Sequence, residues 1–176
     1  MKPENTKELE NNVTLKRQNK ELEELTADKE LEKRNKELLK QYYIELDNTM
    51  IDELDKFVAK FISSDLILHL PGGMDIKGKE GLKAYYESTK MAFPNATHTV
   101  DDVIAEKDKV AFRATTNATH QGEFMGIQPK GEKMKITFDG FWLVREGKIV
   151  EWWSEYDALG MMQQLGMELK PKEVDH

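Results

Sequence analysis

Histidine is the residue type of this chain whose ordinary pKa lies closest to neutral pH, and the chain holds four. They are His69, His98, His120 and His176. Their positions match no spacing of metal ligands that we recognise, and the lack of cysteine excludes thiolate metal sites, disulfides and cysteine nucleophiles. We therefore expect no metal and no other cofactor, which leaves acid–base chemistry by side chains.

His120 is the first candidate for a base. It ends a stretch rich in β-branched residues, 110–120, and Gln121 and Gly122 follow it, which places it at the end of a strand. A histidine pKa of about 6.5 lets the ring accept and release a proton at neutral pH. His98 lies in a stretch without recognisable chemistry, and we expect it to face solvent.

Aromatic and hydroxyl side chains alternate along the last two predicted strands. Successive side chains of a strand point to opposite faces, so residues two apart share a face. The last strand divides into Trp152, Ser154 and Tyr156 on one face and Glu151, Trp153 and Glu155 on the other. The preceding strand divides into Phe138, Gly140, Trp142 and Val144 against Thr137, Asp139, Phe141 and Leu143.

The elements that must position these side chains follow from hydrophobic periodicity. Apolar residues at helical spacing predict helices over 38–46, 51–61 and 78–93. Alternation and β-branched residues predict strands over 66–70, 97–105, 110–120, 133–144 and 149–156, with tight turns at 106–109 and 145–148. Helices first and a long antiparallel meander afterwards indicate an α+β fold, with helices covering one face of a curved sheet.

Composition changes near residue 35. Residues 1–34 form a charged helical extension, 35–170 the globular domain and 171–176 a tail. Leu15 and Leu22 lie seven residues apart, but the step from Leu25 to Leu31 breaks this register, and Thr26 or Asp28 could cap a new helix there. Both a solvated helix and a self-association helix fit this extension.

The overall charge of the chain argues against a nucleic acid partner. The chain carries 26 basic and 33 acidic residues, a formal charge of -7, so we expect no nucleic acid partner. The sequence has neither a run of about 20 apolar residues nor a hydrophobic start, so we expect no membrane association and a cytoplasmic location.

Five strings of residues resemble one known family in their order along the chain. They read GKEGLKAYY (78–86), AFPN (92–95), THQGEFMGI (119–127), GKIVEWW (147–153) and DALGMMQQLG (157–166). This order is similar to that of the SnoaL-like polyketide cyclases, also called ester cyclases, over roughly residues 35–166. That family lies within the superfamily of nuclear transport factor two and ketosteroid isomerase.

The resemblance implies a cone of three helices on a strongly curved, mainly antiparallel sheet, with an internal cavity. It also implies a cofactor-independent aldol ring closure, which needs a base, an acid and donors to an enolate. In the family an acidic residue commonly follows the Trp of the last strand, and a His or Asp faces it from the preceding strand. Here those positions align with Ser154 and Trp142, which lack such chemistry. A slip of one residue would return an acid–base role to Asp139 or Glu155.

Family positions also suggest which side chains meet the ligand. The resemblance implies that the strand face that carries Trp152 lines the cavity. It also implies that His120 and His69 occupy positions where the family commonly has a histidine. The expected contacts to a small apolar organic molecule are His69, Phe124, Trp142, Trp152, Ser154 and Tyr156. Three functions remain open: an acid–base cyclase, lyase or isomerase acting on an apolar carbonyl compound, a non-catalytic binder, and an assembly module. A homodimer is expected under all three.

Overall fold

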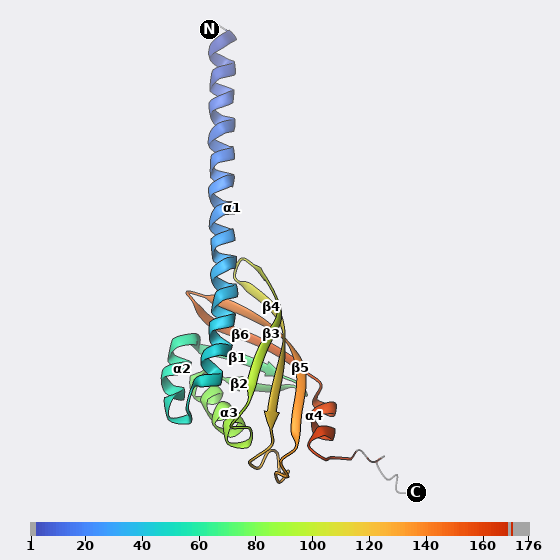
Figure 1. Cartoon of the computed structure of the whole chain (residues 1–176). Coiled ribbons are helices and arrows are strands. Elements are labelled where there is room, and N and C mark those ends of the chain that lie inside the picture. The colour runs from blue at the N-terminus through green and yellow to red at the C-terminus, as the bar shows by residue number, and fades with distance from the viewer. Residues whose placement is uncertain (1–2, 169, 171–176) are drawn as a thin grey trace, which may run out of the picture.

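The computed structural model describes residues 3–168 and 170 (Figure 1). His176 and the expected tail 171–176 lie outside these residues. The helices are α1 (Pro3–Asn48), a short 3-10 turn (Ile51–Glu53), α2 (Leu54–Phe61), α3 (Gly78–Ala92) and α4 (Ala158–Gln164). The strands are β1 (Ile62–Leu70), β2 (Met74–Lys77), β3 (Thr97–Glu106), β4 (Lys109–Thr119), β5 (Lys133–Arg145) and β6 (Lys148–Tyr156).

The strands form one six-stranded sheet in the order β2-β1-β6-β5-β4-β3. All neighbours are antiparallel except β1 and β6, which are parallel. The turn after β5 places Glu146 and Gly147 at positive φ, as a two-residue hairpin turn with the twist of the strands requires. The sheet is curved, and α1, α2 and α3 pack against it (Figure 1), which confirms the expected α+β cone.

Helix α1 is a single helix of 46 residues. The predicted break after Leu25 is wrong: the Thr26 hydroxyl donates to the carbonyl of Leu22 at 2.7 Å, one helical turn back, and caps no new helix. No glycine or proline lies between residues 4 and 48 to end the helix, so the charged extension continues into the first helix of the domain. Its N-terminal part extends away from the sheet (Figure 1).

The point where α1 meets the domain is fixed by polar contacts with the turn after β3. The Asn35 side chain is buried, and its amide donates to the carbonyl of Lys107 at 2.8 Å. The Lys107 ammonium lies 3.7 Å from the carboxylate of Asp28. These contacts set the register of α1 on the sheet and so place the residues of its last turns.

The core is aromatic where α1 and α2 cover the sheet. Tyr42 of α1 is fully buried, and its ring centroid lies within 5.3 Å of the rings of Phe57, Phe61 and Trp142. A second cluster closes the other end of the cone, where Met161 of α4 packs. Of the helices that the structure describes, none carries an apolar stretch long enough to cross a membrane.

Candidate functional site

The inner face of the sheet is built from rows of paired side chains. In the first row His98 of β3 pairs with Thr116 of β4, and Thr116 pairs with Ile136 of β5. The next rows pair Phe138 with Tyr156, Gly140 with Ser154 and Trp142 with Trp152. The rows therefore change from polar and mixed at one end of the sheet to fully aromatic at the other.

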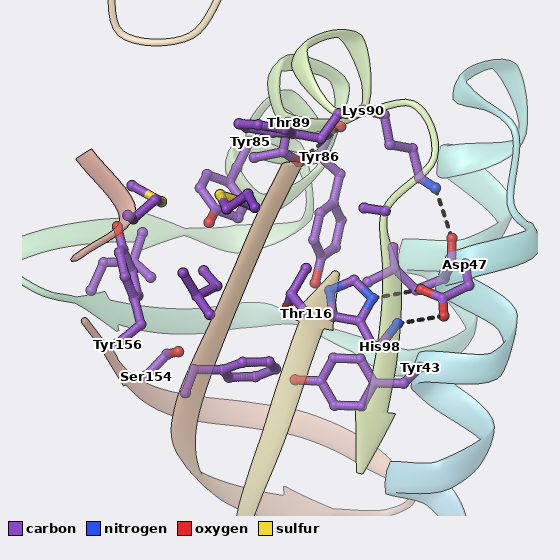
Figure 2. A pocket seen from close by; sticks show the side chains of 18 of the residues that line it. Tyr43, Asp47, Tyr85, Tyr86, Thr89, Lys90, His98, Thr116, Ser154 and Tyr156 are labelled. Atoms are coloured by element: carbon purple, nitrogen blue, oxygen red, sulfur yellow. Dashed lines mark hydrogen bonds and ion pairs between the residues drawn. The ribbon is translucent and has the colours of Figure 1, made fainter. Parts of the chain in front are cut away.

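A cavity of about 150 Å³ lies between this face and helices α1 and α3 (Figure 2). Its walls are mostly apolar and include Leu46, Leu70, Phe93, Met134, Phe138 and Trp152. An apolar cavity of this size can hold a benzene-sized ring. Apolar walls with a few polar groups are the usual composition of a small-molecule site.

Asp47 and His98 form a hydrogen-bonded pair at one end of the cavity (Figure 2). One carboxylate oxygen of Asp47 accepts the backbone N–H of His98 at 2.8 Å, and the other lies 2.5 Å from His98 Nδ1. Both side chains are only 17% exposed. An ionised carboxylate can only accept, so this contact places a ring proton on Nδ1, and in the neutral ring the lone pair is then on Nε2.

The expectation that His98 faces solvent is therefore wrong. β3 is the edge strand of the sheet, but the last turn of α1 covers its inner face at this position. The helix supplies both the carboxylate of Asp47 and the ring of Tyr43, whose centroid lies 5.1 Å from that of His98. The His98 side chain therefore lies on the inner face of β3, beneath α1.

Tyrosines and one lysine surround the pair. Burial raises the pKa of Tyr43 and Tyr86 well above the ordinary value, so both remain neutral phenols. Tyr86 shares a hydrogen bond with Tyr42. Lys90 lines the cavity, but its ammonium donates to the carbonyl of Leu46 at 2.7 Å. Burial lowers the pKa of Lys90, and the nearby Asp47 carboxylate offsets part of this effect.

Four residues expected to contact a ligand do line the cavity. They are Phe124, Trp152, Ser154 and Tyr156. Trp142, expected with them, is 0% exposed and does not line it. Its ring lies 5.0 Å from Tyr42 and 5.5 Å from Trp152, within the aromatic core. Within this one row of the sheet, Trp152 therefore forms part of the cavity wall and Trp142 belongs to the filled core.

Two histidines predicted from the sequence lie outside the cavity lining. His120 is 0% exposed, and its ring lies 5.3 Å from that of Phe93. Its Nδ1 is 3.9 Å from the Glu132 carboxylate, and within the described residues neither ring nitrogen has a hydrogen-bond partner. His120 is therefore packed behind the cavity wall.

His69 lies on the outer face of the sheet. Its ring nitrogens contact the carboxylates of Asp75 at 2.8 Å and Glu151 at 3.3 Å, and its ring stacks on Trp153. Burial disfavours the charged ring, but the two carboxylates outweigh this, so the pKa of His69 is raised. His69 is therefore not among the residues that line the cavity, and it does not contact His98.

The two positions that carry acid–base groups in the resembling family lack them here. Ser154 faces Gly140, and not Trp142 as expected. A Cβ atom at position 140 would lie 2.1 Å from Cζ of Phe112, so the Phe112 ring takes the space of a side chain there. Asp139 of β5 and Glu155 of β6 lie at opposite positions of the two strands, with their side chains on the exposed outer face. The hydrogen-bonded carboxylate and imidazole that line this cavity are instead Asp47 and His98.

Comparison with known proteins agrees with the fold. A family model described as SnoaL-like polyketide cyclase matches residues 37–165. IdmH from Streptomyces antibioticus, named as a candidate polyketide cyclase, is similar at 30% identity and a TM-score of 0.64, over 75% of this chain and 98% of that one. AclR from Streptomyces galilaeus, named as a candidate hydroxylase, is similar at 28% identity and a TM-score of 0.66, over 80% and 85%.

A SnoaL-like protein from Jannaschia shares the fold at 19% identity and a TM-score of 0.71, over 79% of this chain and 96% of that one. Among curated proteins, none matches the chain. The family model covers well over half of the residues and ends at Leu165, the last buried residue of the small second cluster. The chain belongs to the SnoaL-like polyketide cyclase family.

Proposed function

We propose that this protein is a cofactor-independent enzyme that uses His98 as an acid–base group on a small apolar carbonyl compound. The reaction is a ring closure, elimination or double-bond shift of the cyclase, lyase or isomerase type. The single observation that carries the proposal is the Asp47–His98 pair at the end of an apolar cavity. Family membership and the likeness to IdmH, a candidate polyketide cyclase, support the same class.

The proton steps follow from the geometry of the pair. Neutral His98 takes a proton from the carbon next to a carbonyl through Nε2, and the electron pair of that C–H bond moves into an enolate. Asp47 accepts the hydrogen bond from Nδ1–H, which stabilises the positive charge on the ring. The imidazolium then returns the proton to a new alkoxide or to another carbon. Low polarity around the pair strengthens each of these electrostatic interactions.

The proposal is tested by proton exchange on a small apolar ketone. In deuterated buffer the protein should catalyse deuterium uptake at carbon 1 of 2-tetralone, because the protons on this carbon lie next to the carbonyl. His98→Asn should lower the catalysed rate roughly 10²-fold, as expected for loss of a positioned base. The rate is measured by proton NMR.

His69→Asn provides the matched control, since it removes a histidine from the outer face of the sheet. This variant should exchange 2-tetralone at the wild-type rate. Equal rates in wild type and His98→Asn, both above buffer, would refute the assignment of the base to His98.

A non-catalytic ligand binder is the second candidate. The observation that favours it is the loss of both family acid–base positions, where Gly140 and Ser154 stand. A binder would quench or shift the fluorescence of Trp152 on addition of 2-tetralone, and would leave its deuterium exchange at the rate of buffer. The same two measurements therefore separate the two functions.

A further inference from the structure

The hydroxyl of Tyr43 is buried at the end of the cavity that holds His98. Tyr43 lines the cavity and is only 3% exposed, and among residues 3–168 and 170 its hydroxyl has no hydrogen-bond partner. Figure 2 shows this hydroxyl on the side of the ring turned away from α1, with the His98 ring next to the Tyr43 ring. A buried hydroxyl without a partner is costly, and an acceptor atom of a bound molecule would satisfy it.

Other polar groups at this end of the cavity are already engaged within the protein. The Lys90 ammonium donates to the carbonyl of Leu46. The hydroxyl of Tyr86, which also lines the cavity, shares a hydrogen bond with that of Tyr42. The Tyr43 hydroxyl is therefore a buried donor that is available to a ligand.

One turn of α1 carries two side chains that contact His98. Tyr43 and Asp47 are four residues apart, so they share one face of the helix. Asp47 holds Nδ1 of His98, and the Tyr43 ring centroid lies 5.1 Å from that of His98. The indole N–H of Trp152 is a second buried donor of the cavity without a partner in the described part of the chain, but its ring packs on the aromatic core. Of these two donors, Tyr43 is the one whose ring packs on His98.

Proton removal by His98 creates a need that this histidine cannot meet. As the proton moves from carbon to Nε2, the electron pair of the C–H bond moves into the carbonyl group, and negative charge develops on its oxygen. The proton on Nδ1 stays with Asp47, so the neutral ring has no proton to offer that oxygen. A donor already in place for such developing charge is a large source of rate enhancement in enzymes.

The Tyr43 phenol is suited to donate a hydrogen bond. Burial, reinforced by the neighbouring phenols of Tyr86 and Tyr85 and by the Asp47 carboxylate, raises the pKa of Tyr43 well above its ordinary value. The phenol therefore keeps its proton throughout the neutral range. It can stabilise an anionic oxygen without itself becoming charged.

We propose that Tyr43 is a further catalytic residue, whose hydroxyl donates a hydrogen bond to the substrate oxygen as this oxygen gains negative charge. The phenol keeps its proton, so the oxygen is stabilised without a second proton transfer. This role rests on the proposed function of His98 as the base. The ability of the Tyr43 hydroxyl to bind an anionic oxygen does not, and it is measured on its own.

The kinetic test uses Tyr43→Phe, which removes the hydroxyl and keeps the ring that packs on His98. We expect the exchange rate at saturating 2-tetralone to fall about 10²-fold, with the half-saturating concentration within about threefold of wild type, as for loss of a donor to a developing oxyanion. Tyr42→Phe is the matched control, because it removes a buried phenol of α1 that does not line the cavity. Its exchange rate should stay within about threefold of wild type. Equal losses in the two variants would overturn the proposal, because altered packing would explain both.

A stable mimic of the enolate separates the role of Tyr43 from that of the base. 4-Nitrophenol carries its oxygen on a planar carbon, as an enolate does, and its ionised form is coloured, whereas 4-nitrotoluene has nearly the same shape without this oxygen. In the bound state, Tyr43→Phe should lower the ratio of ionised to neutral 4-nitrophenol about 10-fold, read from visible absorbance, as for loss of a hydrogen bond to a charged group. Its affinity for 4-nitrotoluene, from tryptophan fluorescence, should stay within about twofold of wild type.

The outcomes distinguish the two claims. An unchanged ratio for 4-nitrophenol, or an equal weakening of both probes, would overturn the role of Tyr43. Failure of the base would appear separately, as 2-tetralone exchange by wild type at the rate of buffer, while the ratio for 4-nitrophenol would still report on Tyr43.

Discussion

Asp47 and His98 are 51 positions apart, and their contact depends on two elements that the sequence does not join. Alternation along β3 could have placed His98 on the inner face, because it shares a face with Val100, which packs against the core. Asp47 directly follows the buried Leu46 on a helix, which gives no signal of a partner. The contact between Asp47 and His98 can be recognised only once the packing of α1 against β3 is known.

His120 offers a prediction at the scale of a single residue. Its ring is fully buried with neither nitrogen hydrogen-bonded in the described structure, so replacing it by leucine removes an unsatisfied polar group. We expect His120→Leu to raise the free energy of unfolding by about 1 kcal/mol, measured by urea denaturation. The 2-tetralone exchange rate should stay at the wild-type value.

The opposite outcome is equally informative. A stable His120→Leu protein that had lost exchange would restore the catalytic role that the sequence assigned to His120. The sequence placed this residue correctly at a strand end, but burial behind Phe93 is a property of packing. The same holds for Trp142 and Trp152: alternation puts both on the inner face, and only the packing around them makes Trp152, and not Trp142, line the cavity.

At the scale of elements, the strands were the most predictable part. β3 to β6 follow alternation closely, and their hairpin turns end them within a residue or two of the expected bounds. β2, with four residues, and α4, with seven, are too short to show a period, and neither was predicted. The break expected in α1 failed because a local change of leucine spacing does not end a helix that lacks glycine and proline.

The outer face of the sheet carries a pH-dependent contact between elements. His69 of β1 meets Asp75 of β2 and Glu151 of β6, and the pKa of His69 is raised. A raised pKa in the folded state stabilises the fold fully below the unfolded pKa of about 6.5, and this stabilisation is lost as pH rises through the folded pKa. Wild type should therefore exceed His69→Gln by on the order of 0.5 kcal/mol near pH 5.5, and by less near pH 8.5.

Urea denaturation of both proteins at the two pH values gives the difference in unfolding free energy at each pH, and the change in that difference with pH. Asp75→Asn should reproduce part of the loss at the lower pH, because it removes the nearer carboxylate. An advantage of wild type that grew with pH would contradict the raised pKa.

At the scale of the molecule, two exposed features lie outside the cavity: the outer face of the sheet around Trp153 and the N-terminal part of α1. Trp153 on the outer face is 39% exposed beside His69 and Phe141, and this face is where the predicted homodimer would pair. The N-terminal part of α1 extends away from the sheet, and its role in self-association stays a prediction. α1 itself connects this extension to Tyr43 and Asp47, so one continuous helix holds the side chains that contact His98, the proposed base.

The most direct test of the account is the protonation of the His98 ring, read from nitrogen-15 NMR of histidine-labelled protein. Above the pH at which the ring loses its charge, we predict that the remaining proton resides on Nδ1, held by Asp47, and that Nε2 carries no proton. Asp47→Asn should abolish this preference. A ring that carries its proton on Nε2 in the wild-type protein would contradict the assignment of His98 as the base.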